Sequence, residues 1–146
     1  MKHLFILFLF LTTASFSIIA QKPPVYSTEN GAINGYDPVA YFKESLPVQG
    51  KDGFQTEWKN ARWKFASKAN LDTFIANPDR FVPQYGGYCA YGASNNYKAP
   101  TSADAWAIVE GKLYLNYNKN VQKEWIKTSG KRIRDADLYW PDLVNK

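Results

Sequence analysis

The residues of this chain that could do chemistry gather in one short stretch, GGYCAYG, from Gly86 to Gly92. It contains Cys89, the only cysteine in the sequence, with Tyr88 directly before it and Tyr91 two residues after it. Glycines at this density suit a backbone that bends sharply or lies close to another surface. A thiol in such a stretch is either a small buried hydrophobic group or a reactive nucleophile, and both interpretations stay open.

A nucleophilic cysteine needs a neighbouring base or a positive environment to form its thiolate. The only histidine is His3 and the only methionine is Met1, so both lie at the extreme N-terminus. The sequence contains no glycine motif of the kind that binds phosphates or dinucleotides or that carries a serine nucleophile. We therefore assign no catalytic residue. An enzyme that uses the Cys89 thiolate is kept as an alternative to a non-catalytic function.

The first 20 residues have the pattern of a secretory signal peptide. A basic start precedes the apolar run Leu4 to Leu11, and a softer segment ends at Ala20. Cleavage there predicts an exported protein, periplasmic or secreted, with residues 21–34 as a linker and residues 35–146 as one domain. An uncleaved membrane anchor is the alternative, although the run is short for a spanning helix and contains Thr and Ser.

Composition limits the partners and cofactors. The chain of 146 residues carries a formal charge of +5, but its basic residues are spread out, and only Lys131 to Arg134 form a cluster. Spread basic charge is typical of a solvated surface, so we expect no nucleic-acid partner. After signal cleavage, no further apolar run is long enough to span a membrane. Cleavage also removes the only His and Met, which leaves one thiol as the sole soft ligand, so we expect no metal and no cofactor.

Hydrophobic patterning predicts short strands in pairs. Two segments alternate apolar and polar residues around a two-residue turn, Lys59-Asn60 in one and Glu110-Gly111 in the other, as β-hairpins do. The predicted strand pairs are 54–58 with 61–66 and 105–109 with 112–117. Hairpins that alternate with helices predict a small single-domain α+β fold, in which short antiparallel hairpins pack against a few helices.

Polar residues ahead of apolar stripes predict where two helices begin. Asp37 is expected to cap a short helix in GYDPVAYF, with Pro38 at its first position. Ser67 is expected to cap a second helix that runs to about Ala76, where an Asn-Pro pair stops it.

A third helix is expected to begin at Asn118 or Asn120 and to end at Gly130. One last helical turn is expected at 135–139, before a Trp-Pro pair. The side chains that these helices and the second hairpin should turn inward are Leu71, Phe74, Ile75, Trp106, Ile108, Leu113, Leu115, Val121, Trp125 and Ile126.

The run WKFASKANLDTFIANPDRF, from Trp63 to Phe81, resembles the YHS domain. The opening GYDPVAYF also resembles the Asp-Pro-Val start of that family, and the resemblance covers roughly residues 35–141. The chain is similar to the longer exported members, which are called YHS domain-containing proteins. The positions that match the family's pattern in the first run are Phe65, Ser67, Phe74, Asn77 and Pro78.

The resemblance implies a metal-associated protein, with copper or zinc, as an alternative function. Metal-handling YHS domains carry cysteines after Asp-Pro-Val and at two places around the serine. This chain has Ala40, Ala66 and Asn70 at those places, and none of them is a soft ligand. The positions that match the family are therefore those that pack in the core or cap a helix.

The function that we expect is a non-catalytic binding module for a small ligand or a partner protein. Tyrosine offers a flat apolar face and a polar tip, which suits the binding of small ligands or peptides. A structural role, in which these tyrosines only cover the core, is the alternative. The candidate ligand-binding residues are Cys89, Tyr88, Tyr91, Tyr36 and Asp37.

Overall fold

Two β-hairpins and the helices that follow them organise the structure, a computed structural model that describes residues 21–146. The predicted signal peptide lies outside the described residues. The strands are β1 (Ser27–Thr28), β2 (Gly31–Ala32), β3 (Lys51–Trp58), β4 (Ala61–Phe65), β5 (Ser102–Val109) and β6 (Lys112–Asn116). The helices are α1 (Ala40–Lys43), α2 (Lys68–Ala76), α3 (Pro78–Phe81), α4 (Ala90–Ala93), α5 (Lys119–Lys127) and α6 (Ser129–Leu143), with 3₁₀ turns η1 (Ile33–Gly35) and η2 (Gln84–Gly87).

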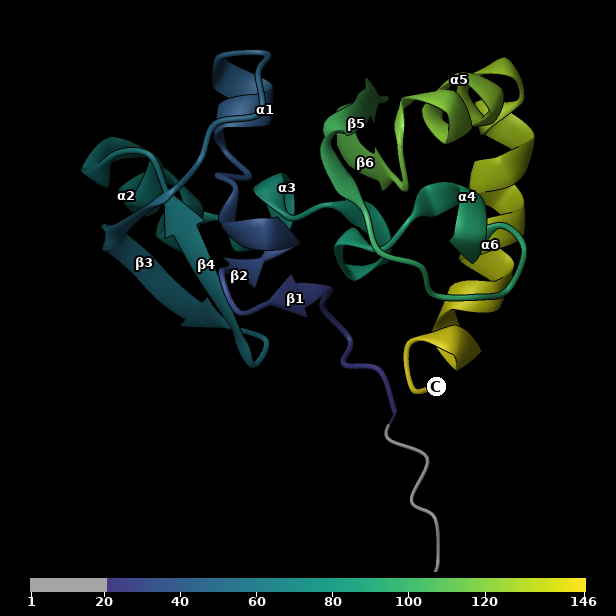
Figure 1. The fold of residues 1–146 in the computed structure, drawn as a ribbon, viewed down its shortest axis with the longest axis horizontal. Helices are drawn as coiled ribbons and strands as arrows, with labels where there is room; N and C mark the ends of the chain where they lie inside the picture. Colours follow the sequence, from purple (N-terminus) through teal and green to yellow (C-terminus); the bar gives the residue numbers. More distant parts are fainter. Residues whose placement is uncertain (1–20) are drawn as a thin grey trace, which may run out of the picture.

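The strands pair as three separate two-stranded antiparallel sheets, β1–β2, β3–β4 and β5–β6, within residues 21–146. Figure 1 shows the β3–β4 hairpin and α2 on one side of the molecule, and β5–β6 with α4, α5 and α6 on the other. The predicted small single-domain α+β fold is confirmed. None of the helices in this part of the chain is long and apolar enough to cross a membrane.

Both predicted hairpin turns are confirmed. Trp58 pairs with Ala61 across Lys59 and Asn60, whose φ angles of 49° and 57° are those of a type I′ turn. In the second hairpin the same two-residue spacing closes across Glu110-Gly111. Strand β3 begins at Lys51, earlier than the expected start at residue 54, because Lys51 pairs with Phe65 across an irregularity in the register that precedes Gln55.

Side-chain caps begin α2 and α5 at residues that the sequence offered. The Ser67 hydroxyl accepts a hydrogen bond from the N–H of Asn70 (3.2 Å), so α2 begins and ends as expected. Asn118, rather than Asn120, caps α5, because its Oδ1 accepts from the N–H of Val121 (2.9 Å).

The last helix differs most from expectation. Gly130 does not end a helix but lies in the first turn of α6, which has 15 residues and contains the whole expected turn at 135–139. Ala136 and Leu143 are buried on this helix, so tertiary packing stabilises it where a single helical turn would be marginal. Pro141 lies in the last turn of α6, where its missing N–H removes a single backbone hydrogen bond.

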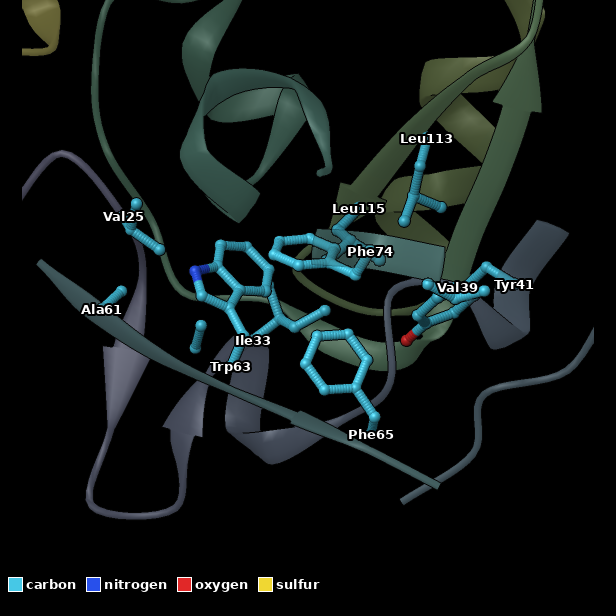
Figure 2. Packing of buried hydrophobic residues seen from close by; sticks show 11 residues of the cluster. Val25, Ile33, Val39, Tyr41, Ala61, Trp63, Phe65, Phe74, Leu113 and Leu115 are labelled. Carbon is cyan, nitrogen blue, oxygen red and sulfur yellow. The ribbon is translucent and has the colours of Figure 1, made fainter. Parts of the chain in front are cut away.

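Two apolar clusters form the core, and strand β6 lies between them. The first cluster contains Phe65 and Phe74, and the second contains Trp125. Alternation along β6 sends Leu113 and Leu115 into the first cluster and the intervening Tyr114 into the second. Figure 2 shows side chains of the first cluster, which are Val25, Ile33, Val39, Tyr41, Ala61, Trp63, Phe65, Phe74, Leu113 and Leu115.

The segment 21–34, which was expected to be a linker, contributes to the core. Val25, Ala32 and Ile33 are buried in the first cluster. The backbone N–H of Tyr26 donates to the carbonyl of Gly86 (2.9 Å), which ties this segment to the glycine-rich stretch. Residues 25–33 therefore fold as part of the domain.

Three isoleucines that were expected to face inward are exposed. Ile75 follows the buried Phe74, and Ile126 follows the buried Trp125; successive helical residues point about 100° apart, so each isoleucine faces outward. Ile108 lies one residue before the end of β5, beside the hairpin turn, where no element covers it well. The buried stripe is narrower than the apolar pattern predicted.

Substitutions in α2 separate packing from capping. Phe74 is fully buried and its ring lies 5.0–6.0 Å from those of Phe65, Trp63 and Trp58. We predict that Phe74→Ala lowers the free energy of unfolding by about 3–5 kcal/mol because it opens a cavity. Ser67→Ala should lower it by about 1 kcal/mol through loss of the cap. Urea denaturation followed by circular dichroism measures both, and equal small effects would contradict this assignment of the core.

Candidate functional site

The buried carboxylate of Asp37 joins the start of α1 to the start of α2. Its Oδ1 accepts hydrogen bonds from the backbone N–H groups of Val39 (2.8 Å) and Ala40 (3.3 Å). Its Oδ2 accepts from the N–H of Ala66 (2.9 Å) and from the side-chain amide of Asn70 (2.7 Å). Asp37 is fully buried, and these four donors satisfy the carboxylate. The carboxylate thus binds the start of α1, but the predicted cap position was wrong, because the N-cap is Val39 and Pro38 precedes the helix. Asp37 also links two distant segments.

Three residues without a soft ligand atom, Ala40, Ala66 and Asn70, meet at this carboxylate. Ala40 and Ala66 present methyl groups, and Asn70 uses its amide to donate to Asp37. With no thiolate or imidazole here, and with each Asp37 oxygen already accepting two hydrogen bonds, the residues do not fit a copper or zinc ion. In residues 21–146 no three His, Cys, Asp or Glu side chains form a group that could hold a metal.

Cys89 lies at the N-cap of α4, and its side chain is buried with 2 % of its surface exposed. Its Sγ accepts a hydrogen bond from the N–H of Gly92 (3.5 Å), and its thiol donates to Oδ1 of Asn116 (3.8 Å). Burial raises the pKa of the Cys89 thiol, and nearby backbone N–H groups offset only part of that rise. This environment keeps the sulfur protonated and favours a structural thiol over a nucleophile.

Tyr91 is connected to Cys89 through Asn116. The Asn116 Oδ1 that accepts from the thiol also accepts from the backbone N–H of Tyr91 (3.2 Å). The Arg132 guanidinium lies 3.8 Å from the centre of the Tyr91 ring, and it donates to the hydroxyl of Ser94 (3.0 Å). One face of Tyr91 is therefore already occupied by a cation of the same chain.

Tyr88 points away from Cys89 and holds the beginning of the domain. Its phenol donates to the carbonyl of Pro23 (2.8 Å), and its ring lies beneath the ammonium of Lys98 (5.3 Å). The Lys98 ammonium donates to the carbonyls of Lys22 and Val144 (both 2.9 Å). Burial lowers the pKa of Lys98. Tyr88 and Lys98 together attach residues 22–23 to the end of α6.

The five predicted site residues do not form one site. The structure joins Cys89 and Tyr91 through a shared partner, whereas Asp37 is enclosed and Tyr36 lines a separate hollow of about 370 Å³ with Asp104. A second pocket, of about 390 Å³, includes Tyr91. Neither Cys89 nor Tyr88 lines either of these pockets.

A larger pocket, of about 440 Å³, lies where the two apolar clusters meet, and we call it the seam pocket. Trp58 and Trp63 belong to the first cluster, and Tyr85 and Trp140 belong to the second. The lining includes these four aromatic side chains and two charged ones, Lys59 and Asp137, and its other residues are uncharged.

Three separate parts of the chain position the aromatic walls of the seam pocket. The turn and strand of the β3–β4 hairpin supply Trp58 and Trp63, and the indole N–H of Trp63 donates to the carbonyl of Trp58 (3.1 Å). Tyr85 comes from η2 and meets Trp140 of α6 edge to face, with ring centres 5.7 Å apart. Asp137 precedes Trp140 by three residues and therefore lies on the same side of α6.

Tyr85 is held in a strained backbone conformation at this pocket. Its φ of 55° is rare for a bulky residue, and Gly86 and Gly87 continue the left-handed turn with φ of 60° and 81°. A Cβ at Gly86 would lie 1.9 Å from the carbonyl oxygen of Pro24, so only glycine fits. The phenol of Tyr85 donates to Asp137 (2.9 Å), and burial together with that bond raises the pKa of Tyr85.

The seam pocket was not found from the sequence, although the glycine-rich stretch pointed close to it. The sequence predicted a site at Cys89, whereas the pocket is lined by Tyr85, which precedes the two glycines. Trp58 and Trp140 lie far from Tyr85 in the sequence and on different elements, so no periodicity could place the three on one surface. The Gly-Gly pair after Tyr85 was the only signal of an unusual turn there.

Comparisons with protein-family models, with curated proteins and with solved structures each give no match.

Replacing Asp37 tests whether its carboxylate holds the two segments together. We predict that Asp37→Asn lowers the free energy of unfolding by about 3 kcal/mol, since an amide NH₂ would face buried donors that need an acceptor. Asp104→Asn, at an exposed residue of β5, is the matched control and should change stability by less than about 0.5 kcal/mol. Urea denaturation at pH 7 measures both, and similar values for the two variants would contradict the role of Asp37.

The reactivity of Cys89 tests its burial. Because its pKa is raised above the ordinary thiol value of about 8.5, the native thiol stays neutral where an unfolded one ionises. We predict that maleimide labels the native protein much more slowly than the urea-unfolded protein from pH 7 to pH 9. Above about pH 8.5 the unfolded state releases the thiol proton while the native state keeps it. The contribution of Cys89 to the free energy of unfolding therefore falls as the pH rises above that value. Rapid labelling of the native protein at pH 7 would instead indicate an activated thiolate.

Proposed function

We propose that this chain is an exported, YHS-like binding module that holds a small ligand in the seam pocket and catalyses no reaction. The observation that carries the proposal is the pocket itself, in which four aromatic side chains and two charged ones converge from three parts of the chain. Small-molecule sites are mostly apolar hollows of roughly 300–1,000 Å³ with few polar groups, and this pocket agrees with that description.

The backbone around Tyr85 supports the same location. A left-handed φ at a bulky residue persists only where the surrounding structure compensates its cost, and such residues gather at binding and catalytic sites. Here the turn places the Tyr85 phenol on Asp137 and its ring against Trp140. The turn therefore builds one wall of the pocket.

A thiol-dependent enzyme is less well supported than a binding module. Cys89 is buried, its partners are the side chain of Asn116 and backbone N–H groups, and burial raises its pKa. A nucleophilic thiol needs a base or a cation that lowers its pKa. Since Cys89 also lies outside the seam pocket, we place no reaction there. A partner protein, in place of a small molecule, is the alternative occupant.

Native mass spectrometry of the protein purified from its own host tests the proposal. We predict that the wild type retains a small molecule and that Trp58→Ala loses it, because Trp58 is a half-buried wall of the pocket. Tyr117→Ala, at an exposed residue outside the pocket, is the control and should retain the molecule. The same masses show whether the exported chain begins at Gln21.

Two results would contradict this function. Retention of the molecule by Trp58→Ala would move the binding site elsewhere, and a bare protein mass in both the wild type and Tyr117→Ala would remove the support for a retained ligand. A full-length chain in the membrane fraction would favour the anchor interpretation of residues 1–20 over export.

A further inference from the structure

We propose that the seam pocket binds an organic cation, a substituted or quaternary ammonium group, which takes the place that the Lys59 ammonium now has over Trp58. This rests on the proposed function, because it names the class of ligand for the same pocket. It also assigns a role to Lys59 as a side chain that competes with the ligand.

The walls of the pocket have the chemistry that recognises cations. The face of an indole ring carries negative electrostatic potential, so tryptophan attracts a cation more strongly than tyrosine or phenylalanine does. Three of the four aromatic side chains here are tryptophans, namely Trp58, Trp63 and Trp140. Trp58 and Trp140 are only half-buried, which leaves ring surface for a ligand.

The chain already places an ammonium group on this surface. The Nζ of Lys59 lies 4.2 Å from the centre of the Trp58 ring, well within the range of a cation–π contact. Its only ion pair within residues 21–146 is a long one, with Asp79 at 3.7 Å between two exposed side chains. Exposed pairs of this kind contribute little, so Lys59 can leave the ring when another cation arrives.

Asp137 supplies the negative charge of the pocket. One carboxylate oxygen, Oδ1, accepts from the Tyr85 phenol (2.9 Å), and in the described part of the chain no lysine or arginine forms an ion pair with this residue. A carboxylate beside aromatic faces attracts an ammonium group by charge while the rings contact its apolar substituents. The phenol of Tyr85 holds the carboxylate in place without neutralising it.

Another cation near the pocket is Lys98. Its Nζ lies 5.9 Å from the centre of the Trp140 ring, but Lys98 does not line the pocket. Its ammonium donates to the carbonyls of Lys22, Pro23 and Val144, so those contacts hold it in place. Lys98 therefore does not compete for the pocket as Lys59 does.

Choline and its neutral isostere, 3,3-dimethyl-1-butanol, test the charge directly because the two differ mainly in the central atom. Isothermal titration of the exported chain at low salt should show that choline binds at least about tenfold more tightly than the alcohol. Choline binding should weaken as salt is added, since Asp137 is exposed and its attraction is screened. Equal affinities for choline and the alcohol would overturn the proposal.

Variants of the two charged side chains give the second arm. Asp137→Asn keeps an acceptor for the Tyr85 phenol but removes the charge, and it should weaken choline binding several-fold at low salt. Asp135→Asn removes the same charge from α6 outside the pocket, and its affinity should match the wild type. Lys59→Gln should tighten choline binding, because the competing ammonium is gone. Thermal unfolding of each variant shows that it is folded.

These measurements test the organic-cation assignment separately from the proposed binding function on which it rests. Weaker binding of choline by Lys59→Gln would show that the Lys59 ammonium does not compete with the ligand for the Trp58 ring and would overturn the proposal. Binding of both probes with equal affinity, lost in Trp58→Ala, would also overturn it but would leave the pocket as a binding site. Failure of both probes to bind would overturn it as well, and the retained host molecule would then decide the binding function independently.

Discussion

The structure depends on one buried carboxylate. Asp37 receives two hydrogen bonds from the start of α1, one from the segment after β4 and one from α2, so a single side chain joins parts of the sequence about thirty residues apart. A charge in the interior is tolerable only with such complete satisfaction. A hydrogen-bonded carboxylate thus cross-links these segments of the chain.

Strand β6 connects the two apolar clusters of the core. Its side chains enter both apolar clusters, Leu113 and Leu115 on one face and Tyr114 on the other, so the clusters pack against a shared wall. Where the clusters meet away from β6, large rings from each leave a gap, and this gap is the seam pocket. Rigid packing on both sides keeps its aromatic walls in place, which is what a preorganised binding site requires.

Local signals were enough to predict the two hairpin turns and the helices α2 and α5. Two-residue turns, the caps at Ser67 and Asn118 and the stop after α2 each depend on neighbours in the sequence, and each is present. The length of α6 and the exposure of Ile75 depend on which surfaces meet, and a single sequence does not contain that information. For the same reason the sequence predicted a site around its one chemically distinctive residue, Cys89. The pocket is instead lined by aromatic residues that the sequence does not distinguish from residues of the core.

The pocket also depends on the segment that follows the predicted leader. Val25 lines its wall, and the carbonyl of Pro24 lies so close to Gly86 that the left-handed turn at Tyr85 and this segment fit only together. Tyr88 and Lys98 hold the segment just before it against the end of α6. The Cys89 thiol is therefore part of the structure, and the glycine-rich stretch contributes to the pocket through its backbone. It bends the chain so that the N-terminal segment, the β3–β4 hairpin, η2 and α6 enclose one aromatic surface.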